Sequence, residues 1–197
     1  MKIEVQNPNI IRVAYHQEPG DYLYGSCLWA YYDFDLDKYM MNVQSDCGNA
    51  AYRWYATPKT ESFLQLMARM NDDTYLLEKL YGDPKRVDVD ETIKELREWL
   101  GIGQDEDLKD ESISDDDREE MEAALEWLEG LLKDHSFLDK DTAEAIIENW
   151  NNEHEYELDA VYERIVTDYT AWEKRVVQIF IEHIRPKIAE LATKEAV

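Results

Sequence analysis

The first part of the chain alternates between apolar and polar positions with a period of two. The stretches IIRVAYH (residues 10–16) and SCLWAYYDF (26–34) show this alternation, as do Ile3 and Val5. Residues 39–56 read YMMNVQSDCGNAAYRWYA, in which two alternating runs flank a short polar segment that contains a glycine. Because successive side chains of a strand point to opposite faces, the pattern predicts about four antiparallel strands, the last two joined as a hairpin.

From about residue 60 onward the apolar residues recur three and four positions apart, which is the period of an amphipathic helix. Residues that can cap a helix, such as Thr60 and Ser114, precede most of these runs, and Gly82 and Gly101 follow two of them. These signals predict helices over residues 61–70, from 72 or 73 to 82, from 90 to 101, from 114 to 134 and from 141 to 151.

The longest pattern lies in the last segment. Apolar residues recur at every seventh position, and a second apolar line lies four positions further on: Leu158, Ile165, Trp172 and Ile179, then Tyr162, Tyr169 and Val176. A stripe this wide predicts one long helix packed in a bundle, whose core would contain Trp150 and Trp172. We expect Pro186 to kink or divide this helix, because proline interrupts the backbone hydrogen-bond ladder.

The change of period predicts an α+β fold, in which a small N-terminal antiparallel β-sheet with an aromatic hairpin precedes an acidic helical bundle. We predict two domains, over residues 1–102 and 103–197. The charge is also uneven, since −2 of the net charge of −24 falls on residues 1–60 and −22 on the rest. A hydrophobic fraction of 44% and an aromatic fraction of 12% exclude a disordered acidic tail as a description of the whole chain.

Cys47 is the residue whose role decides whether this pattern describes an enzyme. A nucleophilic thiolate needs a neighbouring positive charge, whereas Cys47 follows Asp46, which opposes ionisation. Gly48 and Asn49 tolerate positive φ, so the segment is typical of a turn. Cys27 and Cys47 form no CxxC pair and are expected to be reduced thiols. No phosphate-binding, dinucleotide-binding or nucleophile-elbow motif occurs, and we predict no catalytic residue, cofactor or metal site.

The segment around this turn resembles a known group of proteins. SDCGNAAYRW followed by TPKTESFLQLMARMNDDTYLLEKL is similar to a motif of small proteins from phages and prophages of Gram-positive bacteria. In that family an SDCGN turn leads into an aromatic strand ending in Arg-Trp and then into a threonine-led helix. The resemblance covers about residues 30–80. It implies a mobile-element setting and brings no catalytic residues.

The acidic half of the chain favours a protein that binds a basic partner. From 105 to 129 there are thirteen acidic residues against two basic ones. On the fourth helix, carboxylates three and four positions apart would stand roughly 5–6 Å from one another, a spacing of the same order as that of phosphates along a strand. The protein would then be an inhibitor of the DNA-mimic type, acting on a CRISPR effector or restriction enzyme. The predicted partner-binding residues are Asp115, Asp116, Asp117, Glu119, Glu122, Glu126 and Glu129, with Tyr52 and Trp54 of the hairpin as apolar anchors.

Two alternatives stay open. Acidity can serve solubility alone. The protein can also be a phage housekeeping module or an enzyme, with a pocket between the sheet and the helices to which Arg53, Arg69, His16 and Cys47 contribute. Direct binding of nucleic acid is not expected, because phosphate contacts need a basic patch. The N-terminus has no signal-peptide pattern and no apolar run reaches the roughly 18 residues of a membrane span, so we expect the host cytoplasm; the oligomeric state stays open.

Overall fold

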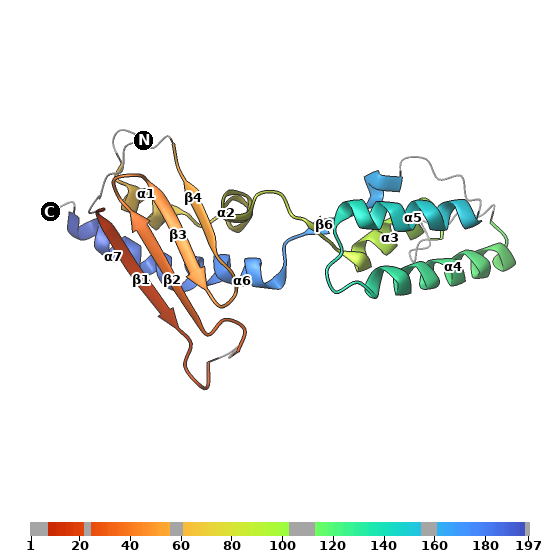
Figure 1. The fold of residues 1–197 in the computed structure, drawn as a ribbon, viewed down its shortest axis with the longest axis horizontal. Coiled ribbons are helices and arrows are strands. Elements are labelled where there is room, and N and C mark those ends of the chain that lie inside the picture. Colours follow the sequence, from red (N-terminus) through yellow and green to blue (C-terminus); the bar gives the residue numbers. More distant parts are fainter. Residues whose placement is uncertain (1–7, 22–24, 56–60, 103–112, 155–160, 196–197) are drawn as a thin grey trace, which may run out of the picture. The chain divides into compact units, whose positions relative to one another are not determined.

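The chain of 197 residues folds as two compact units in a computed structural model (Figure 1). The structure describes residues 8–21, 25–55, 61–102, 113–154 and 161–195. Unit 1 consists of residues 1–83 and 169–197, and unit 2 consists of residues 84–168. Unit 2 is therefore an insertion within unit 1. This division differs from the predicted boundary at residue 102, because the C-terminal segment belongs to the same unit as the sheet.

Unit 1 contains a four-stranded antiparallel sheet with the strand order β1-β2-β3-β4. The strands are β1 (Ile10–His16), β2 (Trp29–Asp35), β3 (Met40–Ser45) and β4 (Ala50–Arg53). The predicted strands and the hairpin are thus confirmed, while Ile3 and Val5 lie outside the described residues. Alternation in β2 places Tyr32 and Phe34 in the core and leaves Trp29 and Tyr31 partly exposed.

The buried face of the sheet packs against the helices that follow it in sequence and against helices from the C-terminal end of the chain (Figure 1). These are α1 (Phe63–Arg69), α2 (Asp73–Tyr81), α6 (Ala171–Ile179), the π-helix η3 (Phe180–Ile184) and α7 (Arg185–Glu195). The Tyr32 hydroxyl donates a hydrogen bond of 2.7 Å to the carbonyl of Val176, 144 residues away in sequence. The ring of Phe180 lies 6.1 Å from that of Tyr32 and 6.5 Å from that of Phe34. The C-terminal helices therefore complete the core of unit 1.

Unit 2 is helical, with a short two-stranded sheet where the chain enters and leaves it. Its elements are β5 (Arg86–Val87), α3 (Val89–Trp99), α4 (Asp115–Lys133), α5 (Lys140–His154), the 3-10 helix η2 (Val161–Arg164) and β6 (Thr167–Asp168). β5 and β6 are antiparallel, with Val87 opposite Thr167. Trp150 is 1% exposed and its indole N–H donates to the carbonyl of Ala124 at 3.0 Å, which fastens α5 to α4. The segment from 103 to 112 lies outside the described residues.

The first five predicted helices are present at the expected positions, and their caps explain where they begin. Ser62 and Gln65 form a capping box at the start of α1, whereas the predicted cap Thr60 lies outside the described residues. Asp72 caps α2 and Ser114 caps α4, as the sequence pattern predicts. The side chain of Asp88 caps α3, so that this helix begins slightly earlier than predicted.

The prediction of one long final helix is wrong. Thr167 and Asp168 form a strand, and a new helix begins after Thr170, which forms a capping box with Glu173. Ile165 is buried in unit 2, but Trp172 belongs to unit 1 and is 52% exposed. The seven-residue recurrence therefore joins apolar positions that pack into two separate cores. From Ala171 to Glu195 the chain is helical throughout, and the π-helical segment η3 interrupts the α-helical hydrogen-bond pattern directly ahead of Pro186, where the proline predicts a disturbance.

The first testable prediction concerns the core of unit 2. Replacement of Trp150 by alanine removes a fully buried ring and leaves the carbonyl of Ala124 without its indole donor. We expect a loss of about 3–5 kcal/mol of unfolding free energy, measured by urea denaturation followed by circular dichroism.

The matched control is Trp172→Ala. The heptad pattern predicts a loss as large as that of Trp150→Ala, whereas the exposure of Trp172 predicts a change within about 1 kcal/mol. Equal losses for the two variants would contradict the packing described for unit 2 and the surface position of Trp172.

Candidate functional site

All seven acidic residues that the sequence predicts as partner-binding lie on α4. Glu122 accepts a hydrogen bond of 2.9 Å from the guanidinium of Arg97, and Glu129 forms an ion pair with Lys133. Glu119 and Glu126 are exposed and form no ion pair with any residue that the structure describes. Asp115 and Asp116 are also exposed, and Asp117 accepts a hydrogen bond from the capping hydroxyl of Ser114. The predicted stripe is therefore neutralised at two of its four glutamates.

The two aromatic anchors predicted in the hairpin do not lie on a free surface. Trp54 is 6% exposed, and its indole N–H donates to the hydroxyl of Tyr75 at 3.0 Å. Trp54 is a core residue because α1 and α2 cover the end of β4; its ring lies 5.7 Å from that of Phe63. Tyr52 is half-buried and packs edge-on against Trp54. Both residues belong to unit 1, whereas α4 belongs to unit 2.

An aromatic side chain that sequence reasoning missed lies on α4 itself. Trp127 is 48% exposed and directly follows Glu126. The signal was present in the sequence, because Trp127 falls off the buried line of Leu125, Leu128 and Leu132. The exposed side of α4 thus combines unpaired carboxylates with one aromatic side chain.

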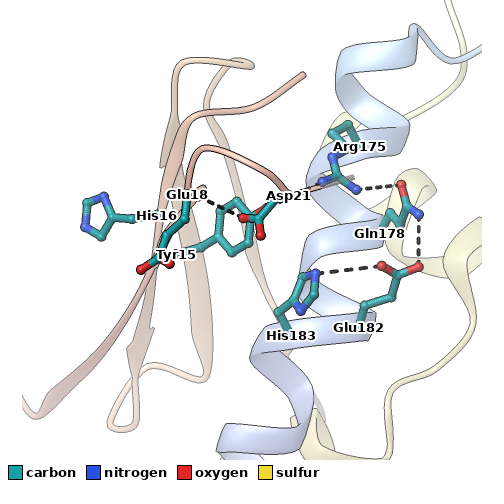
Figure 2. Close-up of a pocket in the computed structure, with 8 residues that line it drawn as sticks. All are labelled: Tyr15, His16, Glu18, Asp21, Arg175, Gln178, Glu182 and His183. Atoms are coloured by element: carbon teal, nitrogen blue, oxygen red, sulfur yellow. Dashed lines mark hydrogen bonds and ion pairs between the residues drawn. The ribbon is translucent and has the colours of Figure 1, made fainter. Parts of the chain in front are cut away.

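A polar pocket of about 570 Å³ lies in unit 1 between β1 and the α6–η3 helix (Figure 2). Its lining residues are Tyr15, His16, Glu18, Asp21, Arg175, Gln178, Glu182 and His183. A hydrogen-bonded row runs along the helix, since Arg175 donates to Gln178 at 2.9 Å and Gln178 donates to Glu182 at 2.9 Å. The volume lies within the range of small-molecule sites.

Arg175 is the unusual member of this pocket. It is 8% exposed, and its Nε has no hydrogen-bond partner among the described residues. A terminal nitrogen of its guanidinium lies 3.5 Å from the hydroxyl of Tyr15. Burial raises the pKa of Tyr15, although the charge of Arg175 opposes this shift. A buried guanidinium with a spare donor can bind an anionic or carbonyl oxygen.

Only His16 among the four predicted pocket residues lines this pocket. The side chain of Arg53 donates to the carbonyl of Lys38 at 3.1 Å, and Arg69 forms a two-point ion pair with Glu61 at 2.7 and 2.9 Å. Cys47 lies in a separate cluster. The sequence therefore predicted a pocket between sheet and helices, but most of its lining residues were not predicted.

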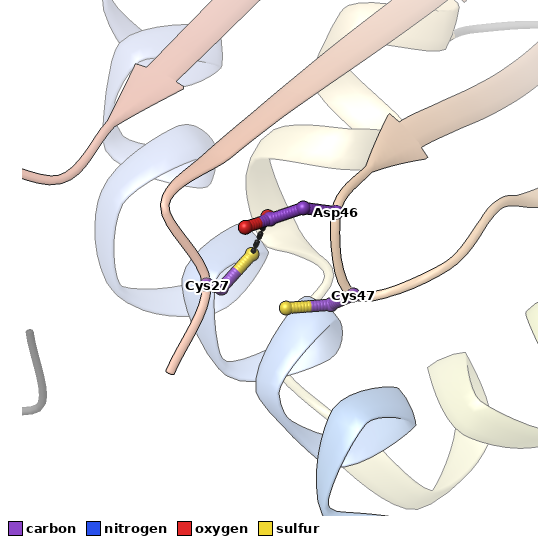
Figure 3. Close-up of side chains that lie close together, drawn as sticks. All are labelled: Cys27, Asp46 and Cys47. Carbon is purple, nitrogen blue, oxygen red and sulfur yellow. Dashed lines mark hydrogen bonds between the residues drawn. The ribbon is translucent and has the colours of Figure 1, made fainter. Parts of the chain in front are cut away.

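A second cluster in unit 1 consists of Cys27, Asp46 and Cys47 (Figure 3). The two sulfur atoms and a carboxylate oxygen all lie within 4.8 Å of one another. The thiol of Cys27 donates to Oδ1 of Asp46 at 3.4 Å, and the thiol of Cys47 donates to the carbonyl of Ser26 at 3.1 Å. Both cysteines are free and buried.

The sheet register brings these residues together. Ala30 on β2 pairs with Ser45 on β3, so the residues just before β2 lie beside those just after β3. Asp46 and Cys47 occupy the turn between β3 and β4, where Gly48 has a φ of 116°. The turn predicted for this segment is therefore confirmed. The sequence did not predict that Cys27 lies close to Asp46 and Cys47, because neither cysteine belongs to a local motif.

The protonation states within the cluster follow from burial and hydrogen bonding. Burial raises the pKa of the Cys27 thiol and also that of the Cys47 thiol. For Asp46 burial acts to raise the pKa, but hydrogen bonds from the backbone amides of Leu28 and Trp29 outweigh it, so the pKa lies below its ordinary value. At neutral pH the cluster therefore contains two neutral thiols beside one carboxylate, which does not favour a nucleophilic cysteine.

The fold and these sites define an α+β protein with an acidic helical insertion. Residues 1–190 match the model of a phage family, Phage_phiTE_072, and the chain belongs to this family. Comparison with curated proteins and with solved structures gave no match. Among the described residues, no helix is both long and apolar enough to cross a membrane. The phage setting implied by the resemblance is thus confirmed at the level of the family.

The second prediction concerns thiol reactivity. Because both thiols are buried and protonated, alkylation by iodoacetamide in the presence of a metal chelator should be at least about 100-fold slower in the native protein than in urea. The rate should rise with pH, since the thiolate is the reacting form. Mass spectrometry of the wild type beside Cys27→Ser assigns each modification, and fast native labelling of Cys47 would contradict its burial.

Proposed function

We propose that this phage protein is an inhibitor that presents the carboxylates of unit 2 to a basic nucleic-acid-binding protein of the host defence, such as a CRISPR effector or a restriction enzyme. In this proposal α4 occupies a surface that otherwise binds nucleic acid. The protein acts by binding and catalyses no reaction.

The observation that carries the proposal is the placement of charge. Unit 2 has 29 acidic and 9 basic residues, a net charge of −20, whereas unit 1 has 16 acidic and 12 basic residues, a net charge of −4. Most of the negative charge of the protein thus belongs to one inserted helical unit. A field of one sign on a compact unit attracts a basic groove and accelerates association.

The exposed side of α4 supports a defined contact surface. We call Asp115, Asp116, Glu119, Glu120, Glu126 and Trp127 the α4 face. Glu119 and Glu126 are seven residues apart, which is roughly 10 Å along the helix axis. Trp127 supplies an apolar anchor beside the carboxylates, the role that the sequence pattern had predicted for Tyr52 and Trp54.

The ion pairs within unit 2 involve carboxylates outside the α4 face. Glu122 and Glu129 neutralise Arg97 and Lys133 within unit 2. Lys133 also contacts Asp90 at 2.7 Å. Arg97 and Lys133 therefore compensate carboxylates outside the α4 face, whereas the carboxylates of the α4 face stay available to a partner.

The experiment measures phage plating on host strains that each carry one restriction or CRISPR system. Expression of the wild-type protein should raise plating efficiency in a susceptible strain. The triple variant Glu119→Lys, Glu120→Lys and Glu126→Lys should abolish this effect while α4 stays folded. With the purified effector, the triple variant should associate at least about 10-fold more slowly, and binding should weaken as salt rises and compete with DNA.

A matched control reverses three carboxylates of α5: Glu144→Lys, Glu148→Lys and Glu153→Lys. The change in net charge is the same, but these side chains lie off the α4 face. Retained inhibition in this control supports recognition by α4. Equal loss in both triple variants would assign the effect to net charge, and unchanged inhibition in both would overturn the proposal.

A second candidate function is the binding of a small polar molecule in the pocket of Figure 2. This corresponds to the alternative prediction of an enzyme or a phage housekeeping module. The buried Arg175 with its unpartnered Nε favours it. The variants Glu182→Gln and His183→Ala alter exposed pocket residues and leave the α4 face unchanged. Loss of activity in these folded variants, with full activity in the α4 triple variant, would favour the pocket.

A further inference from the structure

We propose that Cys27, Asp46 and Cys47 form a zinc-binding site with two sulfur ligands and one oxygen ligand. The site lies in unit 1 and does not depend on the proposed function of unit 2. The three side chains come from two chain segments that the sheet register holds together, the residues before β2 and the β3–β4 turn.

The distances fit a tetrahedral metal centre. Zinc binds thiolate sulfur at about 2.3 Å and carboxylate oxygen at about 2.0 Å, so a tetrahedral angle separates the two ligand atoms by roughly 3.5 Å. Sγ of Cys27 lies 3.4 Å from Oδ1 of Asp46. The three potential ligand atoms all fall within 4.8 Å of one another. Two sulfur ligands of one zinc ion stand roughly 3.8 Å apart, so small side-chain rotations complete the arrangement.

The surroundings hold the ligands in place. The carboxylate of Asp46 accepts hydrogen bonds from the backbone amides of Leu28 at 3.0 Å and Trp29 at 3.3 Å. The amide of Cys47 donates to the hydroxyl of Ser45 at 3.1 Å, and that hydroxyl donates to the carbonyl of Gly48 at 2.6 Å. Contacts of this kind orient the side chains that bind the ion in metal sites.

The accessibility of the cluster leaves room for a fourth ligand. Asp46 is exposed, whereas the two cysteines are buried. An ion can therefore enter from the side of the carboxylate, and a water molecule from that side completes four-coordination. Three protein ligands and one water are the arrangement of an open zinc site.

The donor set selects the metal. Two sulfur ligands favour zinc over magnesium or calcium, which prefer oxygen ligands. On binding, each thiol releases one proton to solvent and forms a metal–sulfur bond, so Zn²⁺ neutralises two of the three negative charges.

The test uses the full-length protein, reduced and stripped of metal, with Co²⁺ as a spectroscopic substitute for Zn²⁺. We expect one equivalent of Co²⁺ to produce a thiolate-to-metal charge-transfer band together with the visible bands of tetrahedral Co²⁺. One equivalent of Zn²⁺ should remove these bands and raise the melting temperature. Carboxylates of unit 2 that bind Co²⁺ weakly give no thiolate band, so the acidic surface cannot imitate this result.

Variants assign the ligands. Cys27→Ser and Cys47→Ser should each weaken Co²⁺ binding by more than the roughly 10- to 100-fold loss typical of an outer-shell change. Asp46→Asn keeps one oxygen, which can accept one of the two amide hydrogen bonds, but removes the charge, and it should weaken binding with the thiolate band retained. Asp37→Asn is the matched control, since Asp37 is an exposed aspartate in another hairpin turn of the same sheet; its affinity should equal that of the wild type.

Each remaining outcome overturns the proposal. Absence of a thiolate band in the wild type shows that the cysteines are core residues that bind no metal. A band of equal strength in the folded Cys27→Ser or Cys47→Ser variant excludes that cysteine as a ligand. The Co²⁺ titration of the wild type does not depend on the variants, so it tests for the metal site even if a cysteine variant fails to fold.

Discussion

The apolar face of the β-sheet is covered by a helix from the opposite end of the chain, and the rest of the structure depends on this contact. Tyr32 on β2 donates to the carbonyl of Val176 on α6, and Phe180 packs against the same part of the sheet. The sheet alone would leave this face in water, which is unfavourable at roughly 25 cal/mol per Å² of apolar surface. Residues 84–168 must therefore leave unit 1 and return to it at neighbouring points, which the pairing of β5 with β6 permits.

Most of the negative charge lies on the inserted unit 2 and not on unit 1, which contains the sheet. Unit 2 combines a net charge of −20 with an apolar core, and several of its basic side chains are paired with carboxylates, as Arg97 is with Glu122. Solubility needs net charge but no particular placement of it. The unpaired carboxylates and Trp127 on one helix support the proposed binding surface, because an apolar anchor supplies the specificity that charge alone lacks.

Unit 1 contains two sites that are linked through one buried charge. Arg175 lines the polar pocket, and its positive charge also acts on Cys47 of the thiol cluster. An unpaired guanidinium inside a protein is costly unless other groups compensate it. In the structure Gln178 accepts a hydrogen bond from the guanidinium of Arg175 and the hydroxyl of Tyr15 lies 3.5 Å from a terminal nitrogen, so polar groups of the pocket partly compensate this charge.

Much of the secondary structure could be predicted because it depends on local signals. The strands follow a period of two, and α2 and α4 begin at Asp72 and Ser114 because these side chains accept the first free amide hydrogen bonds of each helix. The final helix was predicted wrongly, although its true beginning carried a local signal: Thr170 and Glu173 have capping-box spacing. The seven-residue recurrence of apolar residues predicted a single helix instead, because such a recurrence does not show whether the residues pack into one core or into two.

The sequence by itself determined the four strands of the sheet and the first five helices, that the negative charge lies mainly beyond residue 60, and that α4 presents carboxylates. Only the tertiary structure decided that Trp54 is buried and Trp172 exposed, that Cys27 meets Cys47, and that β1 and α6 enclose a pocket around Arg175. The reason is physical. Periodicity and capping depend on neighbours within a few residues, whereas burial and proximity depend on which distant segment covers each face.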